Sequence, residues 1–312
     1  MRVLMVCDYL GASNPSGAGR YLVETAEALR RRGHEVSILA GGESFPYPAD
    51  GGRMAWLLGG GLGKIREAFA KATREFRPTH LLFHQPLSAW AVLPSELPKA
   101  YVFHSPWGDE LEARGAGPFS SWIRAQMERR VLSAVGRVAT LSAFMEKRMR
   151  EIHPDLGLAV LQAPGGADLG RFTFTTPPSR ERKTVLTVRR LVPRMGLENL
   201  LEAFAKLPSP KPRLVIAGRG PLEGALKAQA ESLGLEVEFP GYVPEAALPA
   251  LLGSADLFVL PSLTLEGFGM VIAEAMACGT PVLGTRVGAI PEVLGAFSKD
   301  LVCDDLKEGL ER

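Results

Sequence analysis

Short apolar segments alternate with longer segments of helical periodicity along the first half of the chain. Each apolar run, rich in Val, Leu or Ile, is followed by a turn and then by a helix-length segment. The runs lie at residues 3–7, 36–39, 81–83, 101–104 and 138–141. Such alternation is typical of βαβ units, in which buried parallel strands are joined by helices. The first half therefore predicts a parallel sheet covered by helices.

The same pattern restarts after Phe172. Further apolar runs, again separated by helical segments, lie at residues 185–188, 214–217, 237–239, 257–260 and 282–283. Between the two series, residues 163–183 are rich in glycine, proline and charge, which favours a connector over a core element. We therefore predict an α/β protein with two Rossmann-like domains, residues 1–163 and 164–312, and the length of 312 residues agrees with two domains.

Composition and charge argue against a disordered chain, a nucleic-acid-binding protein and a membrane-spanning protein. With 46% hydrophobic and 22% charged residues the chain is expected to fold, and its net charge of +2 predicts no binding to nucleic acid. The three cysteines, Cys7, Cys278 and Cys303, are too scattered for a disulfide framework or a zinc knuckle. No apolar run approaches the length that spans a bilayer. We expect a cytoplasmic protein whose contact with the inner face of the membrane is at most peripheral.

The segment EGFGMVIAEAMACGTP, residues 266–281, carries the most chemical information. Gly267 and Gly269 let the backbone approach a ligand, and the first amides of the predicted helix after them form an anion site. Helical side chains lean toward the N-terminus, so the Glu274 carboxylate is expected to reach a sugar hydroxyl beyond a bound phosphate. For a lone glutamate, a solvated helix face is the alternative. With Glu266 also flanking the anion site, the pattern favours a sugar phosphate ligand.

This segment resembles the E-x7-E motif of retaining glycosyltransferases with the GT-B fold, and those of glycosyltransferase family 4 in particular. Residues 16–39 resemble the glycine loop and first helix of that family, and PGGADLGRF resembles its interdomain crossing. Residues 187–204, 213–221 and 237–243 resemble successive elements of its nucleotide-binding domain. The resemblance implies that two Rossmann-like domains face each other across a cleft. It also implies sugar transfer from a nucleoside diphosphate sugar to an acceptor hydroxyl.

The resemblance also implies roles for single residues of the second domain. Glu274 matches a glutamate that binds the nucleotide ribose, and Glu266 matches one beside the transferred sugar. Arg190 matches an arginine that grips the diphosphate, a role suited to a guanidinium. The candidate donor-binding residues are Gly17, Arg190, Arg194, Gly218, Tyr242, Glu266, Gly267, Phe268, Gly269, Met270, Val271 and Glu274.

The chain departs from the family pattern at Met195, where the family usually has a lysine. A thioether cannot neutralise a phosphate, but Arg189 and Arg194 are additional cations beside the gap. We expect Arg194 to supply the missing charge. The alternative is a catalytically weak or inactive nucleotide-sugar-binding protein of the same fold. Family members also continue past the segment that ends at Arg312, so we expect the second domain to lack their crossing helices.

In the first half, His104 ends an apolar run, and open α/β sheets bind ligands at the carboxyl ends of their strands. The resemblance implies that His104 faces the transferred sugar, and the alternative is a hydrogen-bonded core histidine. His104, Glu266 and Arg190 are the candidate catalytic residues. Trp107, Asp109 and Glu110 are candidate acceptor-binding residues, although Trp107 could equally pack between domains. Ser142 is predicted to cap a helix.

Neither a D-x-D motif nor a histidine cluster is evident in the sequence, and the resemblance likewise implies chemistry without a metal or another cofactor. The expected donor is a UDP- or GDP-sugar, and the acceptor is a glycan, a lipid or a small molecule. An NAD-dependent oxidoreductase is a rival on fold grounds. The first strand, however, lacks a compact G-x-G-x-x-G after it, and no acidic ribose anchor closes the second strand.

Overall fold

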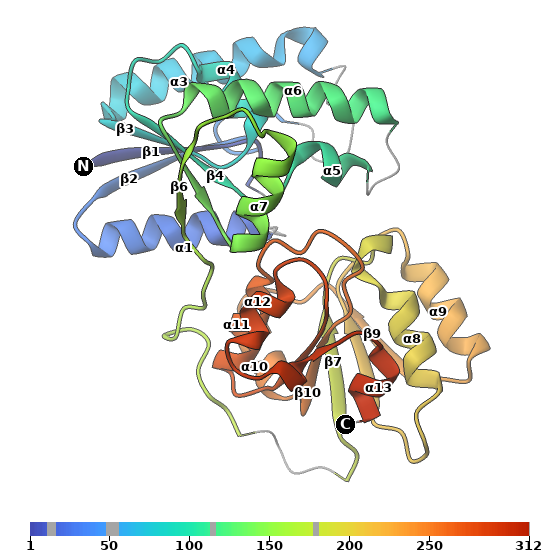
Figure 1. Cartoon of the computed structure of the whole chain (residues 1–312). Coiled ribbons are helices and arrows are strands. Elements are labelled where there is room, and N and C mark those ends of the chain that lie inside the picture. Colours follow the sequence, from blue (N-terminus) through green and yellow to red (C-terminus); the bar gives the residue numbers. More distant parts are fainter. Residues whose placement is uncertain (11–16, 48–55, 113–116, 177–180, 312) are drawn as a thin grey trace. The chain divides into compact units, whose positions relative to one another are not determined.

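The computed structural model describes residues 1–10, 17–47, 56–112, 117–176 and 181–311. The chain divides into two compact units, Met1–Pro164 and Gly165–Arg312, each built on its own parallel sheet (Figure 1). The sequence places the boundary one residue earlier. Residues 177–180 of the predicted connector, and residue 16 of the predicted glycine loop, lie outside the described residues.

Among its described residues, the first unit forms a six-stranded sheet in the order β2-β1-β3-β4-β5-β6. The strands are β1 (Arg2–Cys7), β2 (Glu35–Ala40), β3 (His80–Phe83), β4 (Lys99–Phe103), β5 (Arg137–Thr140) and β6 (Ala159–Gln162). The helices are α1 (Gly17–Arg31), α3 (Leu62–Phe76), α4 (Pro86–Val92), α5 (Trp107–Glu112), α6 (Pro118–Ala134) and α7 (Ala143–Ile152), and a π-helical turn (Leu57–Gly61) precedes α3.

Both faces of this sheet are buried, which explains the continuous apolar runs. Along β1, Leu4 and Val6 join one core together with Ile65 of α3. Val3, in the alternate register, joins a second core with Leu22 of α1. Helices α3, α4 and α6 therefore cover one face and α1 covers the other (Figure 1).

In the described part of the second unit, the sheet again has six parallel strands, in the order β12-β11-β10-β7-β8-β9. The strands are β7 (Thr184–Val188), β8 (Arg213–Ala217), β9 (Val237–Gly241), β10 (Leu257–Leu260), β11 (Val282–Thr285) and β12 (Val302–Cys303). The helices are α8 (Leu197–Ala205), α9 (Glu223–Ser232), α10 (Leu248–Gly253), α11 (Met270–Ala277), α12 (Ile290–Gly295) and α13 (Leu306–Glu311). Short 3-10 turns span Pro193–Met195 and Lys299–Leu301.

Helices sandwich this second sheet as well. Helices α8, α9 and α13 pack on one face, while α10, α11 and α12 pack on the other (Figure 1). From the neighbours β7 and β10, the chain moves outward in opposite directions, through β8 to β9 and through β11 to β12. In the first unit, the strand order reverses in the same way between the neighbours β1 and β3. The loops diverge at the carboxyl ends of such strand pairs, where open α/β proteins bind ligands.

The predicted strands are confirmed with shifts of a few residues, and two strands were missed. His104 follows β4 rather than ending it. Strand β6 escaped notice because its residues are mostly exposed at the sheet edge, and β12 because it has only two residues. The cap at Ser142 is confirmed, since the Ser142 hydroxyl accepts a hydrogen bond from the Met145 amide at 3.1 Å.

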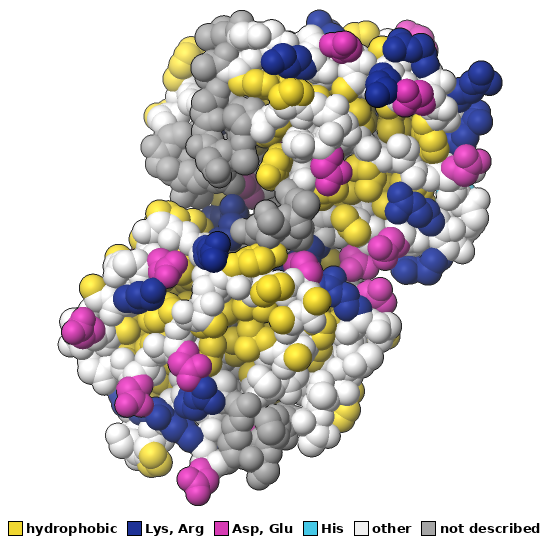
Figure 2. Space-filling view, turned by 180° about the vertical axis from the view of Figure 1, so that it is seen from behind, with side chains coloured by type: hydrophobic (Ala, Val, Ile, Leu, Met, Phe, Trp, Pro, Cys, Tyr) yellow, Lys and Arg dark blue, Asp and Glu magenta, His cyan; other side chains and the backbone are white. Residues whose placement is uncertain are grey.

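The surface agrees with the near-neutral net charge. On the face shown in Figure 2, basic and acidic side chains are interspersed over both units. Among the described helices, none is long and apolar enough to cross a membrane.

Candidate functional site

A buried ion pair joins the loops that follow β7 and β10 in the second unit. Arg189 donates hydrogen bonds to the Glu266 carboxylate at 2.5 Å and to the Ser262 hydroxyl at 2.6 Å. Ser262 donates in turn to Glu266 at 3.2 Å. The side chains of Arg189 and Glu266 are only 7% and 13% exposed. Glu266 is thus held rigidly at the point where the strand order reverses.

Sequence reasoning did not identify Arg189 as the partner of Glu266. It assigned the next residue, Arg190, to the diphosphate, and Arg190 is exposed whereas the Arg189 side chain is largely buried. No local pattern in the sequence indicates this pairing, because the two residues lie 77 positions apart. The contact between Arg190 and a diphosphate stays a prediction.

The turn before α8 places Arg194 and Met195 very differently. The Arg194 guanidinium donates to the carbonyl of Leu265 at 3.2 Å, and the Arg194 carbonyl accepts from the Leu263 amide at 2.9 Å. Met195 is 5% exposed and belongs to the core beside α8. The guanidinium is therefore tied to the residue that precedes Glu266, while the Met195 side chain serves packing. Compensation by Arg194 stays a prediction.

The glycine turn before α11 has a left-handed backbone at Gly269. Gly269 precedes the helix with a φ of +77°, and its carbonyl accepts from the Ile272 amide at 2.7 Å. The first amides of a helix have no acceptor within it, so those of Met270 and Val271 suit an anion. A Cβ atom on Gly165 of the connector would overlap the Phe268 and Met270 side chains. These side chains therefore lie against the connector at Gly165, and the role of their backbone amides stays a prediction.

Glu274 is buried within α11, where only 2% of the residue is exposed. Its neighbours Ile272 and Ala275 belong to the core of that face. Burial raises the pKa of the nearby Cys278 thiol, and the charge of Glu274 adds to the effect. A buried carboxylate is costly unless it has polar partners. Its predicted contact with a ribose is not tested by this geometry.

Gly218 and Tyr242 follow β8 and β9 at the same end of the sheet. The Gly218 amide donates to the Gly241 carbonyl at 2.7 Å. Gly218 has a φ of +131° and lies against the Arg189 carbonyl so closely that a Cβ atom would overlap it. Tyr242 is half-buried. Gly218 thus supports the loop of the ion pair, and its donor contact, like that of Tyr242, stays a prediction.

In the first unit, His104 meets a second histidine that sequence reasoning missed. His104 follows β4 and His84 follows β3, and the distance from His84 Nδ1 to His104 Nε2 is 3.2 Å. The ring of Tyr21, from α1, lies edge-on to His104 with 5.4 Å between ring centroids. The missed signal was positional, because His84 comes directly after a predicted strand at the same edge of the sheet.

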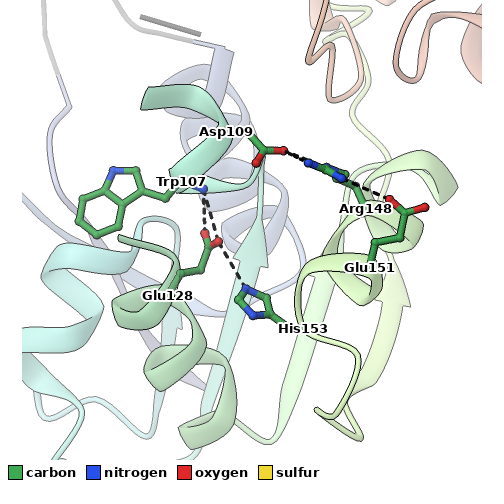
Figure 3. A network of polar contacts seen from close by, with 6 residues as sticks. All are labelled: Trp107, Asp109, Glu128, Arg148, Glu151 and His153. Atoms are coloured by element: carbon green, nitrogen blue, oxygen red, sulfur yellow. Dashed lines mark hydrogen bonds and ion pairs between the residues drawn. The ribbon is translucent and has the colours of Figure 1, made fainter. Parts of the chain in front are cut away.

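The predicted acceptor residues Trp107 and Asp109 take part in a polar network within the first unit (Figure 3). The Trp107 amide donates to both carboxylate oxygens of Glu128, at 3.3 and 3.4 Å. Glu128 is 1% exposed, and its carboxylate lies 3.7 Å from His153 Nε2. Burial raises the pKa of Glu128, although the His153 and Trp107 contacts oppose that rise.

The second half of the network ties α5 to α7. Asp109 pairs with Arg148 at 2.7 Å, and Arg148 also lies 3.4 Å from Glu151 (Figure 3). The Arg148 pKa is raised, chiefly by its hydrogen bond to Asp109. The guanidinium of Arg124 lies over the Trp107 ring, 5.0 Å from the ring centroid. Trp107 and Asp109 therefore hold α5 in place, and their contact with an acceptor stays a prediction.

The two other candidates of this unit have simpler surroundings. Glu110 accepts a hydrogen bond from the Ser105 hydroxyl at 2.9 Å. Gly17 begins α1 and is exposed, and a Cβ atom there would have nothing within 4 Å among the described residues. The described residues thus leave room for a side chain at this position. For neither residue does the structure test a contact with a ligand.

Comparison with known proteins assigns both halves of the chain to related families. The family model described as glycosyl transferases group 1 matches residues 172–308. The model described as glycosyl transferase 4-like domain matches residues 16–165.

Relatives and solved structures agree with these matches. The phosphatidyl-myo-inositol mannosyltransferase of Mycolicibacterium smegmatis is 31% identical over an alignment of 319 positions, gaps included, that covers 94% of this chain and 78% of that protein. The GDP-mannose-dependent alpha-(1-6)-phosphatidylinositol monomannoside mannosyltransferase of the same organism is 32% identical over 196 residues, covering 55% of this chain and 51% of its own. Sucrose-phosphate synthase from Thermosynechococcus elongatus has a similar fold, with a TM-score of 0.76 at 21% identity, covering 94% of this chain and 84% of its own.

Proposed function

Since the chain belongs to glycosyltransferase family 4 and has the GT-B fold, we propose that it transfers a sugar from a nucleoside diphosphate sugar to a hydroxyl of an inositol phospholipid. One observation carries the donor half of this proposal. Glu266 is held by Arg189 and Ser262 at the carboxyl ends of β7 and β10, next to the glycine turn that opens α11. A carboxylate beside an anion site suits a ligand that bears both hydroxyls and phosphates.

The second unit takes the donor in this proposal. The amides of Met270 and Val271, together with the guanidinium groups of Arg190 and Arg194, hold the diphosphate. Glu274 contacts the ribose. Gly218 and Tyr242 complete the donor site together with Gly267, Phe268 and Gly269. From the first unit, Gly17 and His104 contact the transferred sugar, and Trp107, Asp109 and Glu110 contact the acceptor.

The reaction breaks the bond between the anomeric carbon and the diphosphate oxygen, and negative charge grows on the diphosphate as it leaves. Helix amides and guanidinium groups stabilise that charge. The acceptor hydroxyl then bonds to the anomeric carbon from the face that the diphosphate leaves, and its proton passes to the departing phosphate. Configuration is retained, and no metal ion is required.

The names of the relatives suggest which substrates to test first. One relative is a phosphatidyl-myo-inositol mannosyltransferase, and another is described as GDP-mannose-dependent. We therefore propose GDP-mannose over UDP-sugars as donor and a phosphatidylinositol as acceptor. A lipid acceptor would agree with the expected peripheral contact with the inner face of the membrane.

A second candidate function follows from Met195, which fills the core where the family usually has a lysine. Without that charge, the protein would bind a nucleotide sugar with little or no turnover. Binding and turnover must therefore be measured separately.

The test begins with thermal shifts of the chain against UDP, GDP, ADP and their sugar conjugates, because a ligand bound to the native state raises the Tm. GDP and GDP-mannose should give the largest shifts. Mannose transfer is then measured with phosphatidylinositol in vesicles, with and without EDTA, and the anomeric configuration of the product is read by NMR. Product without metal and with retained configuration would support the proposal.

Paired variants locate the donor site. Arg190→Ala should weaken the shift by GDP-mannose, whereas Arg286→Ala, an exposed arginine paired with Asp304 in the same unit, should leave it unchanged. Shifts without any transfer would favour the second candidate. Equal effects of both variants, or a shift only with UDP-sugars, would contradict the donor assignment.

A further inference from the structure

Two histidine rings meet at the carboxyl ends of β3 and β4. The Nδ1 of His84 lies 3.2 Å from the Nε2 of His104, and the ring planes are 31° apart. His84 is 2% exposed, and its backbone amide donates to the Val6 carbonyl at 3.0 Å. His104 is less buried than His84. His84 is therefore the more deeply buried ring of the pair, and His104 is the ring that is proposed to contact the sugar.

Both rings are neutral at physiological pH. Burial lowers the pKa of His84 well below its ordinary value, and the His104 ring nearby lowers it further. Burial also lowers the pKa of His104 to about 4, although the charge of Glu110 opposes this. A neutral imidazole carries one proton, on either Nδ1 or Nε2. One ring must therefore donate the shared hydrogen bond and the other must accept it.

The surroundings of His84 favour one of the two arrangements. Its Nε2 is buried, and among the described residues it has no hydrogen-bond partner. A proton on that atom would leave a buried N–H group without an acceptor, the rarer and costlier kind of unsatisfied group. A proton on Nδ1 instead points at His104 Nε2. The low-cost state is therefore His84 Nδ1–H donating to His104 Nε2.

We propose that His84 is a positioning residue that holds His104 as the Nδ1–H tautomer. The His104 Nε2 is then occupied by the bond from His84, and the ring atom left for a ligand is Nδ1, which carries the proton. His104 consequently donates a hydrogen bond, for example to a sugar hydroxyl, and does not act as a base. Among the described residues, the Tyr21 ring lies beside both histidines and the charge of Glu110 acts on His104. The ligand part of this inference rests on the proposed function, whereas the tautomer does not.

Ring nitrogen NMR of the full chain labelled with ¹⁵N-histidine tests the tautomer directly. The chain has five histidines, and a His104→Asn variant assigns the signal of interest. At pH 7 the His104 Nδ1 should have the shift of a protonated nitrogen and Nε2 that of an unprotonated one. The reverse pattern in the wild-type protein would overturn the inference without any variant at position 84.

Two substitutions of His84 then test its effect on His104. His84→Asn places an amide N–H near the position of Nδ1, whereas His84→Leu has no donor. In His84→Leu the His104 signals should shift toward the Nε2–H tautomer, and kcat should fall by about tenfold or more, as expected when one hydrogen bond in the transition state is lost. His84→Asn should restore the Nδ1–H pattern and most of kcat.

The outcomes separate this inference from the proposed function. An Nδ1–H pattern in a protein that transfers no sugar would contradict the proposed function and support the positioning role. If His84→Leu leaves the His104 tautomer unchanged, or if both variants lose the same fraction of kcat, the positioning role is wrong.

Discussion

Gly218 links the fold of the second unit to its candidate site. It lies just after β8 with a φ of +131°, a conformation that side chains with a Cβ atom rarely adopt. A Cβ atom there would overlap the carbonyl oxygen of Arg189. Because Arg189 holds Glu266, a backbone shift that makes room for alanine must also move the ion pair. Gly218→Ala should therefore reduce both stability and sugar transfer.

The size of the effect follows from two costs. Backbone strain in a region that favours glycine costs about 1–3 kcal/mol. The overlap adds to this, because the obstructing atom belongs to the backbone and cannot rotate away. We expect the free energy of unfolding of the second unit to fall by at least about 3 kcal/mol, which lowers Tm by roughly 6–12 °C for a unit of this size.

Two other glycines of the same unit separate these costs. Gly234 has a φ of +64° but open space around it, so Gly234→Ala should cost only about 1–2 kcal/mol. Gly224 lies in α9, also in open space and without a positive φ, so Gly224→Ala should stabilise by about 0.5–1 kcal/mol. Calorimetry of the full chain measures all three variants. If Gly218→Ala costs no more than Gly234→Ala, the overlap with Arg189 has no energetic effect and the reasoning fails.

Three further predictions concern buried charge, pH and capping. Arg189→Met should destabilise the second unit by about 3–5 kcal/mol in urea unfolding, because Glu266 is left buried without its cation, whereas Arg286→Met at an exposed pair should cost under about 1 kcal/mol. Since burial lowers the His104 pKa to about 4, the unfolded chain binds the proton first, and the Tm of the first unit should fall as the pH drops from about 6.5 toward 4. His104→Asn should weaken that dependence, and a Tm independent of pH would contradict the burial argument. Ser142→Ala removes the cap of α7 and should cost about 1 kcal/mol by thermal unfolding, and an unchanged Tm would show that the cap contributes nothing.

Much of the fold was accessible from local patterns. Buried parallel strands appear as apolar runs and their connections as helical periods, so both sheets could be predicted strand by strand, except for the exposed β6 and the two-residue β12. The turn at Gly269 could also be located, because a glycine pair before an apolar helix is a local signal. The sequence by itself thus determined the α/β class, the family resemblance and the loops that carry the candidate residues.

The tertiary structure decided which of those residues meet. Arg189 and Glu266 are 77 positions apart, and His84 and His104 are 20 apart, so no local pattern pairs them. Their contacts depend on strand order, because β7 becomes the neighbour of β10, and β3 the neighbour of β4, only when the sheets assemble. Packing against strands that are distant in sequence, and not residue type alone, therefore sets the partners in the candidate site.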